Sequence, residues 1–467
     1  MVNLKKIVIL IILVPAALLF AYMPAEAASA FTDLAASSAL LAEADTGTLL
    51  YSSSMSDKHP ADALTRVMTL LLAVAACESG DVKQDELIEM TESAWDGLDA
   101  NSSTLGIKPG EKMPMLDLMY CAFLGGAGEA CNLIAERVAG SVSAFVSRMN
   151  TRASGLSCEN THYTNTHGQY NENQYTTAQD QFYIFREAMN HPLFAEIAGT
   201  YRYTVEATNQ SDARNLVSPN SMLNTNGKYY YSPCTAGAAS ASFEGGYSFV
   251  AFAESDGLSL ISVVLGSDVV VLEDKSTQMR NLTESRRLLD WGFSQFAWRT
   301  VLSSDTPMAK APILHGAGAD FVNLRPETSI KMVLDKDISL DEFKRTVTIY
   351  STQSGEELTA PISAGEILGE VTISRNGVDY GPIKLVANTN VELNRLEYIR
   401  MQLIDLLSSQ AARMIIVALC VLLLLYAVLV IRYNVIRRKR IRRIKEAKRR
   451  LINNAQSNED DNNQSQY

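Results

Sequence analysis

The segment Thr65-Arg-Val-Met-Thr-Leu-Leu-Leu-Ala-Val-Ala-Ala76 decides the fold, because apolar residues lie on every side of the helix that it predicts. A surface helix of a globular protein keeps a polar face, and this segment has none. Its single charged residue is Arg66, near the amino end. We therefore expect a buried, central helix with the other elements of a domain packed around it.

The flanking sequence alternates helical patterns with short β-rich runs from Phe31 to about Trp298. Leu49–Tyr51 follows a turn at Thr46-Gly47 and predicts one arm of a hairpin. The later expected elements are two helices over Met115–Val138 broken at Gly125–Gly128, strands Phe249–Phe252 and Leu258–Leu265 joined at Asp256-Gly257, and a closing helix over Ser285–Phe296. Together they predict a mixed domain of the α/β (α+β) class over residues 28–300.

Residues 301–392 change to short strands separated by turn residues, which predicts a small, sandwich-like all-β domain. Its expected strands are Phe321–Val322, Ile330–Leu334, Val347–Tyr350, Glu370–Ile373 and Ile383–Val386. The apolar spacing over residues 393–412 then predicts an amphipathic linker helix.

Two apolar runs mark the ends of the exported part. Lys5 and Lys6, a short apolar stretch and a small-residue ending near Ala27 predict a secretory signal peptide over residues 1–27. Met414–Ile431 has 18 residues without a charge, long enough for a transmembrane helix, which we place at residues 413–432.

The chain after this span sets the expected orientation. Arg432–Arg450 holds 11 basic residues against one acidic residue, so residues 433–467 should form a cytoplasmic tail, with the domains before the span outside the cell. The last 15 residues are rich in Asn, Gln and Asp and should be disordered. We expect a single-pass protein of the cell membrane.

The net charge of −11 averages two parts of opposite sign. Residues 432–467 hold 11 basic and four acidic residues, a net charge of +7. Residues 28–431 hold 28 basic and 47 acidic residues, a net charge of −19. So acidic an ectodomain is not expected to hold nucleic acid or another polyanion by bulk attraction, whereas the tail should be drawn to anionic lipid head groups.

The cysteines do not predict a metal site. Cys420 lies in the expected span, and the five others, Cys77, Cys121, Cys131, Cys158 and Cys234, lack metal-type spacing. We expect most of them to be small buried residues and leave open whether one pair forms a disulfide after export. No metal and no cofactor are predicted.

Four stretches in order resemble the low-molecular-mass penicillin-binding proteins, the serine D-alanyl-D-alanine carboxypeptidases. Glu43-Ala-Asp-Thr-Gly-Thr-Leu-Leu-Tyr51 is similar to that family's first hairpin, and Thr65-Arg-Val-Met-Thr69 to the helix that carries its nucleophile. Ser157–His162 with Asn165-Thr-His-Gly168 resembles its Thr-His…Asn-x-His-Gly segment, and Thr176–Asp180 its Thr-Ala-x-Asp helix start. The resemblance implies a β-lactamase/transpeptidase fold, an antiparallel sheet flanked by helices, followed by a β domain and a membrane anchor.

The family's acyl transfer needs three motifs, Ser-x-x-Lys, Ser-x-Asn and Lys-Thr-Gly. The resemblance places Ala63 at the nucleophile and Arg66 at the base, and Gly126 and Gly128 at Ser-x-Asn, followed by Glu129 where the family has Asp. It places Ala238, Ala239 and Ser240 at Lys-Thr-Gly, a placement open by a residue or two. Alanine has no attacking atom and arginine keeps its proton, so no catalytic residue is intact.

A displaced motif does not replace the missing one. No lysine in the chain has a serine three positions before it, and no Lys, Arg or His is followed by Thr-Gly or Ser-Gly. His162 and His167 are interpreted as structural residues.

We also interpret Arg66 as structural. Asp62 should cap the helix start and pair with Arg66 one turn later. The positive charge would then be partly neutralised, and the acidic ectodomain would further disfavour an anion. We therefore expect peptides ending in D-Ala-D-Ala to bind no better than their amidated forms.

Three hypotheses of function follow. The first is a membrane-anchored pseudoenzyme that binds peptidoglycan or a cell-wall synthesis protein as a scaffold. The second is an active D-alanyl-D-alanine carboxypeptidase that trims peptidoglycan stem peptides. The third is a receptor-like protein that signals through its basic tail. The missing motifs favour the first.

The orientation can be tested on intact cells. A protease added outside should remove the ectodomain and leave a tag at Tyr467 untouched, because the basic residues after Ile431 hold the tail inside. The test is an immunoblot for the tag, with lysed cells as the control in which the tag is cut. Loss of the tag from intact cells would reverse the topology.

Overall fold

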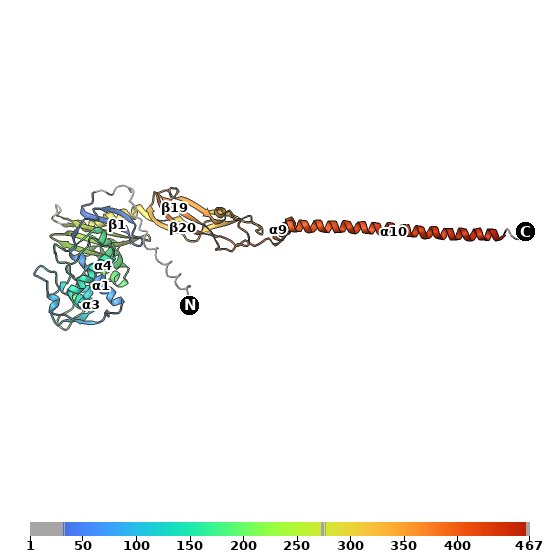
Figure 1. Ribbon diagram of the computed structural model, residues 1–467. Helices are drawn as coiled ribbons and strands as arrows, with labels where there is room; N and C mark the ends of the chain where they lie inside the picture. Colours follow the sequence, from blue (N-terminus) through green and yellow to red (C-terminus); the bar gives the residue numbers. More distant parts are fainter. Residues whose placement is uncertain (1–30, 32, 272–274, 276, 464–467) are drawn as a thin grey trace. The chain divides into compact units, whose positions relative to one another are not determined.

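The computed structural model describes residues 31, 33–271, 275 and 277–463. The expected signal peptide, residues 1–27, lies outside them. The chain divides into two compact units, one that runs to Leu302 and includes Ile330–Phe343, and one made of Ser303–Ser329 and Lys344–Tyr467. Figure 1 shows the elements of each unit.

An antiparallel five-stranded sheet organises the first unit, in the order β2-β1-β11-β10-β9. Its strands are β1 (Ala36–Glu43), β2 (Leu49–Ser53), β9 (Cys234–Ser242), β10 (Gly246–Ser255) and β11 (Leu258–Ser267). The expected hairpin arm is β2. The β10–β11 hairpin turns at Asp256 and Gly257, whose φ angles of 50° and 76° are both positive, as in a type I′ turn.

Seven helices of this unit are described: α1 (Thr65–Glu78), α2 (Met115–Phe123), α3 (Gly128–Ala139), α4 (Val142–Gly155), α5 (Ala178–Met189), α6 (Pro192–Gly199) and α7 (Arg280–Gln295). Side chains alternate across each strand, so the sheet has two apolar faces. Leu40 and Ala42 of β1 join the core that contains α1 to α6, whereas Ala39 and Leu41 join the core beneath α7. The sheet is therefore flanked by helices on both faces, as expected.

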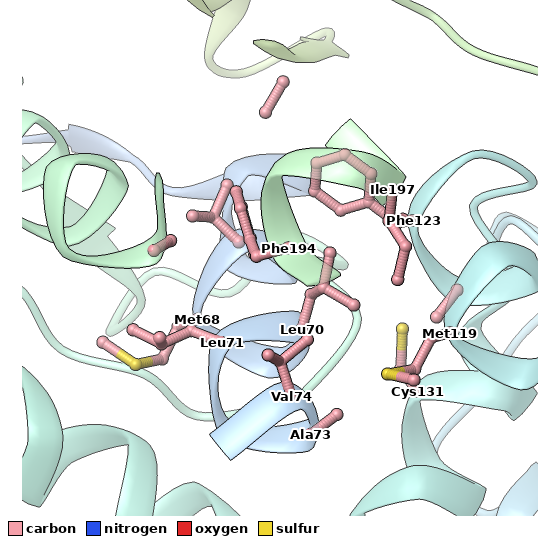
Figure 2. Packing of buried hydrophobic residues seen from close by; sticks show 14 of the residues in the cluster. Met68, Leu70, Leu71, Ala73, Val74, Met119, Phe123, Cys131, Phe194 and Ile197 are labelled. Carbon is pink, nitrogen blue, oxygen red and sulfur yellow. The ribbon is translucent and has the colours of Figure 1, made fainter. Parts of the chain in front are cut away.

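The predicted central helix is confirmed as α1. Val67, Met68, Leu71, Ala73 and Val74 have no exposed surface, and the helix contacts α2, α3, α5 and α6. Figure 2 shows its side chains among Met119 and Phe123 of α2, Cys131 of α3, and Phe194 and Ile197 of α6. The break predicted at Gly125–Gly128 separates α2 from α3.

Short elements complete the first unit. They are β3 (His59–Pro60), η1 (Asp62–Leu64), β4 (Leu87–Glu89), η2 (Ser93–Trp95), β5 (Lys112–Pro114), β6 (Tyr175–Thr176), β7 (Arg202–Val205), β8 (Arg214–Val217), η3 (Ser221–Leu223), β12 (Val269–Val271) and β13 (Thr277–Met279). The single 3₁₀ turn η1 leads directly into α1.

The second unit contains a five-stranded antiparallel sheet in the order β15-β16-β20-β19-β18. Its elements are β15 (Ala309–Pro312), β16 (Phe321–Pro326), β18 (Lys344–Ile349), α8 (Tyr350–Ser354), β19 (Ile367–Arg375) and β20 (Val378–Ala387). The short turn η4 (Leu340–Glu342) belongs to the first unit. One expected strand of this domain lies elsewhere. Ile330–Asp335 forms β17, which pairs with β14 (Phe296–Leu302) and belongs to the first unit.

Two helices follow the second sheet. Helix α9 (Arg395–Ser408) is the expected amphipathic helix, and Ser409, with an extended ψ of 145°, separates it from α10 (Gln410–Asn463). Within Gln410–Ile452 an 18-residue window has a mean hydropathy of 3.3 and none of it is buried in the protein. This stretch is long and apolar enough to cross a membrane.

The disorder predicted for the last 15 residues is not what the structure shows as far as Asn463, because α10 continues that far. Extending an existing helix needs no new nucleus, so the apolar span can propagate helix into polar sequence.

Candidate functional site

The candidate site is the set of residues predicted from the sequence: Ala63, Arg66, Gly126, Gly128, Ala238, Ala239 and Ser240. The turn η1 and the first turn of α1 present Ala63 and Arg66, and both side chains are half-buried. Ser240 lies on β9, the edge strand of the sheet, where its Oγ accepts a hydrogen bond of 3.1 Å from the backbone N–H of Ala63. The first and third predicted positions therefore meet.

The α2–α3 loop brings the second predicted position to Arg66. Gly126 has a positive φ of 69°, and a Cβ built on it would lie 2.7 Å from Arg66 Nη1 and 3.0 Å from Ser103 Oγ. Gly128 opens α3, where a Cβ would lie 2.8 Å from Leu98 Cδ2. A serine and an asparagine at these two positions would fit only if the side chains of Arg66, Ser103 and Leu98 moved aside.

The alanines of β9 do not contribute polar groups. Ala238 is buried and packs in the core around α1, while Ala239, on the other face of the strand, packs toward the core beneath α7. Ser240 shares the face of Ala238, since side chains alternate along a strand. Ser240 alone in this segment offers a hydroxyl to the candidate site.

The predicted Asp62–Arg66 pair is wrong. Asp62 has a φ of 41°, outside the helical range, so it is not one regular turn before Arg66. Its Oδ2 accepts a hydrogen bond of 2.5 Å from Ser242 Oγ, and the residue before α1 is Leu64, which makes no side-chain cap. Burial raises the pKa of the Asp62 carboxyl, and Ser242 opposes that shift only in part.

Arg66 has a different partner. Its Nε donates to the backbone carbonyl of His167 at 2.9 Å, and no carboxylate among the described residues lies within 4.0 Å of the guanidinium. Burial lowers the Arg66 pKa, but a guanidinium starts so high that it remains charged.

His167 is held neutral beside this charge. Its ring is buried, and its Nδ1 accepts a hydrogen bond of 3.3 Å from the Gln169 N–H. Burial, with the positive charge of Arg66 as the second cause, lowers the His167 pKa to about 4. His167 therefore has a structural role: its backbone carbonyl accepts a hydrogen bond from Arg66, and its ring is buried and neutral.

Close backbone approach explains one glycine of the quoted motifs. Gly168 has a φ of 84°, and a Cβ on it would lie 2.0 Å from the Asp62 carbonyl oxygen. The loop that carries His167 thus packs directly on the turn that carries Ala63.

Sequence reasoning missed two features of the site. Ser103, in the loop before α2, lies where a side chain at position 126 would go, and no periodic pattern marks it. Glu129 accepts hydrogen bonds from the backbone N–H groups of Leu105 (2.8 Å) and Ile107 (3.2 Å), which fixes that loop. The Glu129 carboxylate therefore has a structural role, because it holds this loop in place.

The described residues contain no group of three or more His, Cys, Asp or Glu side chains that could hold a metal ion. All six cysteines are free. Burial raises the pKa of Cys121 and Cys131 to about 12 and that of Cys234 to about 11, so these thiols are poor nucleophiles.

Known proteins resemble this chain over both units. The family model for D-alanyl-D-alanine carboxypeptidase matches residues 24–269. The D-alanyl-D-alanine carboxypeptidase DacF of Bacillus subtilis is 25% identical over 73% of this chain and 82% of its own length. DacC of Escherichia coli is 28% identical over 76% of this chain and 83% of its own length.

Solved structures agree in fold. Penicillin binding protein 5 from Haemophilus influenzae superposes with a TM-score of 0.58 at 22% identity, covering 78% of this chain and all of that one. A peptidoglycan synthesis regulatory factor (PBP3) from Streptococcus pneumoniae gives a TM-score of 0.58 at 19% identity, covering 77% of this chain and all of that one. The expected transpeptidase-type fold is confirmed.

Because Gly126 lies close to Arg66, we predict that a substitution at Gly126 lowers the free energy of unfolding by an amount that depends on Arg66. Gly126→Ala should cost about 1 kcal/mol for its positive φ and about 1 kcal/mol more because the Arg66 guanidinium must move away from the new Cβ. Gly140→Ala is the matched control, because Gly140 has a φ of 81° and nothing within 4 Å of its Cβ position. Urea unfolding followed by tryptophan fluorescence measures both, since Trp95, Trp291 and Trp298 all lie in the first unit.

In an Arg66→Ala background most of the additional cost should disappear. Equal costs for the two glycine variants, or no coupling to Arg66, would contradict this account of the loop.

The buried His167 predicts an acid-dependent stability. Unfolded histidine takes up its proton near pH 6.5, whereas folded His167 does so only near pH 4. The unfolded chain therefore binds more protons between these values, so the free energy of unfolding should fall as the pH drops from 6.5 to 4, by at most about 3 kcal/mol. His167→Gln should flatten this part of the pH profile, and identical profiles would refute the prediction.

Proposed function

Because this chain belongs to the D-alanyl-D-alanine carboxypeptidase family of peptidoglycan metabolism, we propose that it is a catalytically inactive member. In this proposal it serves as a membrane-anchored binding or scaffolding module of the cell wall, whose partner is peptidoglycan or a cell-wall synthesis protein. The family assignment rests on the comparisons, and the loss of activity rests on the residues of the candidate site.

The observation that carries the proposal is the chemistry at the start of α1. Serine acyl transfer needs a hydroxyl and a base that can accept its proton. Ala63 offers a methyl group and Arg66 a guanidinium that keeps its charge. The hydroxyl of Ser240, which lies beside Ala63, accepts the Ala63 N–H.

A second observation supports the loss of activity. Acyl-transfer sites stabilise the developing oxyanion with backbone N–H groups that are free to receive it, one of them commonly the nucleophile's own. The corresponding N–H here, that of Ala63, donates to Ser240 Oγ. A substrate carbonyl would have to displace an internal hydrogen bond before it could be polarised.

The anchoring part of the proposal rests on α10. Its apolar stretch supports a membrane helix, and the basic residues that follow support an orientation with the tail inside, against anionic lipids. The first unit would then be held outside the cell, at the wall.

Penicillin labelling tests the inactivity. Incubation of the purified protein with a penicillin should leave its intact mass unchanged, because acylation needs the missing nucleophile. An active family member treated in parallel is the positive control. A covalent adduct on the unmodified protein would end the proposal of an inactive member.

Partial restoration should also fail. Ala63→Ser with Arg66→Lys still lacks polar groups at positions 126, 128 and 238, and residues that act as a unit do not regain activity one at a time. Intact-mass measurement of this double variant, checked for folding by tryptophan fluorescence, should again show no adduct.

A further inference from the structure

Arg66 carries a charge that no acidic group among the described residues balances. Its Nε donates to the His167 carbonyl, but neither Nη1 nor Nη2 has a hydrogen-bond partner within residues 31, 33–271, 275 and 277–463, and neither is one of the fully buried polar atoms that lack a partner. Both nitrogens therefore keep contact with solvent. Arg214 shows the contrast, since its half-buried guanidinium makes two hydrogen bonds of 2.6 and 3.0 Å to Glu111.

The nearest carboxylate in the sequence is committed elsewhere. Asp62 bonds to Ser242, and its Oδ2 lies 2.1 Å from where a Cβ on Gly245 would be. Gly245 thus leaves room for the carboxyl to lie on the β9–β10 turn. The sequence-based expectation that a free carboxylate would bind no better than its amide assumed that Asp62 neutralises Arg66. Asp62 does not do so.

The unpaired guanidinium has both apolar and polar neighbours. Ala63 and Gly126 present a methyl group and bare backbone. Ser103 is exposed, and its hydroxyl has no hydrogen-bond partner in the part of the chain that the structure describes. Ser103 Oγ and Arg66 Nη1 lie 3.0 and 2.7 Å from the Cβ position of Gly126, so the two unused donors are neighbours beside that glycine.

We propose that Arg66 and Ser103 form a non-covalent binding site for a carboxylate. The planar guanidinium matches the two oxygens of a carboxylate, and a partly buried cation without a counter-charge gains from one. A single positive charge balances a single negative charge, so a monoanion fits better than a phosphate dianion. This inference rests on the proposed function, since it identifies a ligand class for a binding module.

The net charge of −19 on residues 28–431 does not exclude this site. Exposed charges more than about 8 Å apart are largely screened at physiological salt. The local, unpaired guanidinium therefore outweighs the distant acidic residues. The expected consequence is a preference for a free acid over its amide.

The test compares two small ligands of nearly equal shape on the full-length protein in detergent. N-acetyl-D-alanine should bind about tenfold more tightly than N-acetyl-D-alaninamide in calorimetric titrations, as for one charge-assisted contact. Arg66→Gln should abolish the preference, and Arg66→Lys should keep part of it. Arg148→Gln is the matched control, because exposed Arg148 donates only to the Val138 carbonyl, and it should keep all of it.

His167 gives a second readout that needs no substitution. The Arg66 charge lowers the His167 pKa, so a bound carboxylate should raise that pKa in an NMR titration, whereas the amide should not. Inorganic phosphate serves as the competing anion. Tighter binding of phosphate than of the acid would overturn the assignment to a carboxylate.

Equal or absent binding of acid and amide, or a preference that survives Arg66→Gln in folded protein, would overturn the site. Either result leaves the proposed function standing, because that proposal fails only if a penicillin adduct forms. The two failures are therefore distinguishable.

Discussion

Burial of α1 on all sides is the constraint on which the first unit depends. A helix with no polar face must be enclosed, so α2, α3, α5 and α6 are held around it. That enclosure also fixes what lies at its amino end. The η1 turn meets β9 on one side and the α2–α3 loop on another, so the three predicted motif positions stay near one another through packing, without any need for catalysis.

The polar groups of this region are mostly satisfied within the protein. Ser240 takes the N–H of Ala63, Ser242 holds Asp62, and Glu129 ties down the loop that carries Leu105. Buried polar groups are costly unless they are bonded, so such a network stabilises one arrangement. Among the described residues, Asp62 Oδ1 and Glu129 Oε2 are buried without a partner. The unpaired Arg66 nitrogens and the Ser103 hydroxyl instead reach solvent, and the proposed ligand chemistry arises at these solvent-facing groups.

The parts of the fold that sequence predicts are those with local causes. The apolar run of α1, the turn residues of the β10–β11 hairpin and the glycines between α2 and α3 each act over a few positions. The Asp62–Arg66 pair failed because it assumed a regular helix, whereas Asp62 is held by Ser242, 180 residues further along the chain. Likewise Ile330–Asp335 was recognisable as a strand, but its partner β14 follows from tertiary contacts that no strand pattern contains. No sequence pattern marks Ser103 as a residue of the site, because it belongs there only through its contact with the Gly126 position.

The close approach of Gly126 to Arg66 also limits the order in which substitutions can accumulate. A side chain at 126 must displace the long guanidinium, so a polar residue there costs less once position 66 carries a shorter side chain. Substitution at 66 alone would discard a hydrogen bond to His167 and leave a gap beside bare backbone. The two positions are thus coupled, and a reversal at either one alone leaves a less well-packed intermediate than a reversal at both.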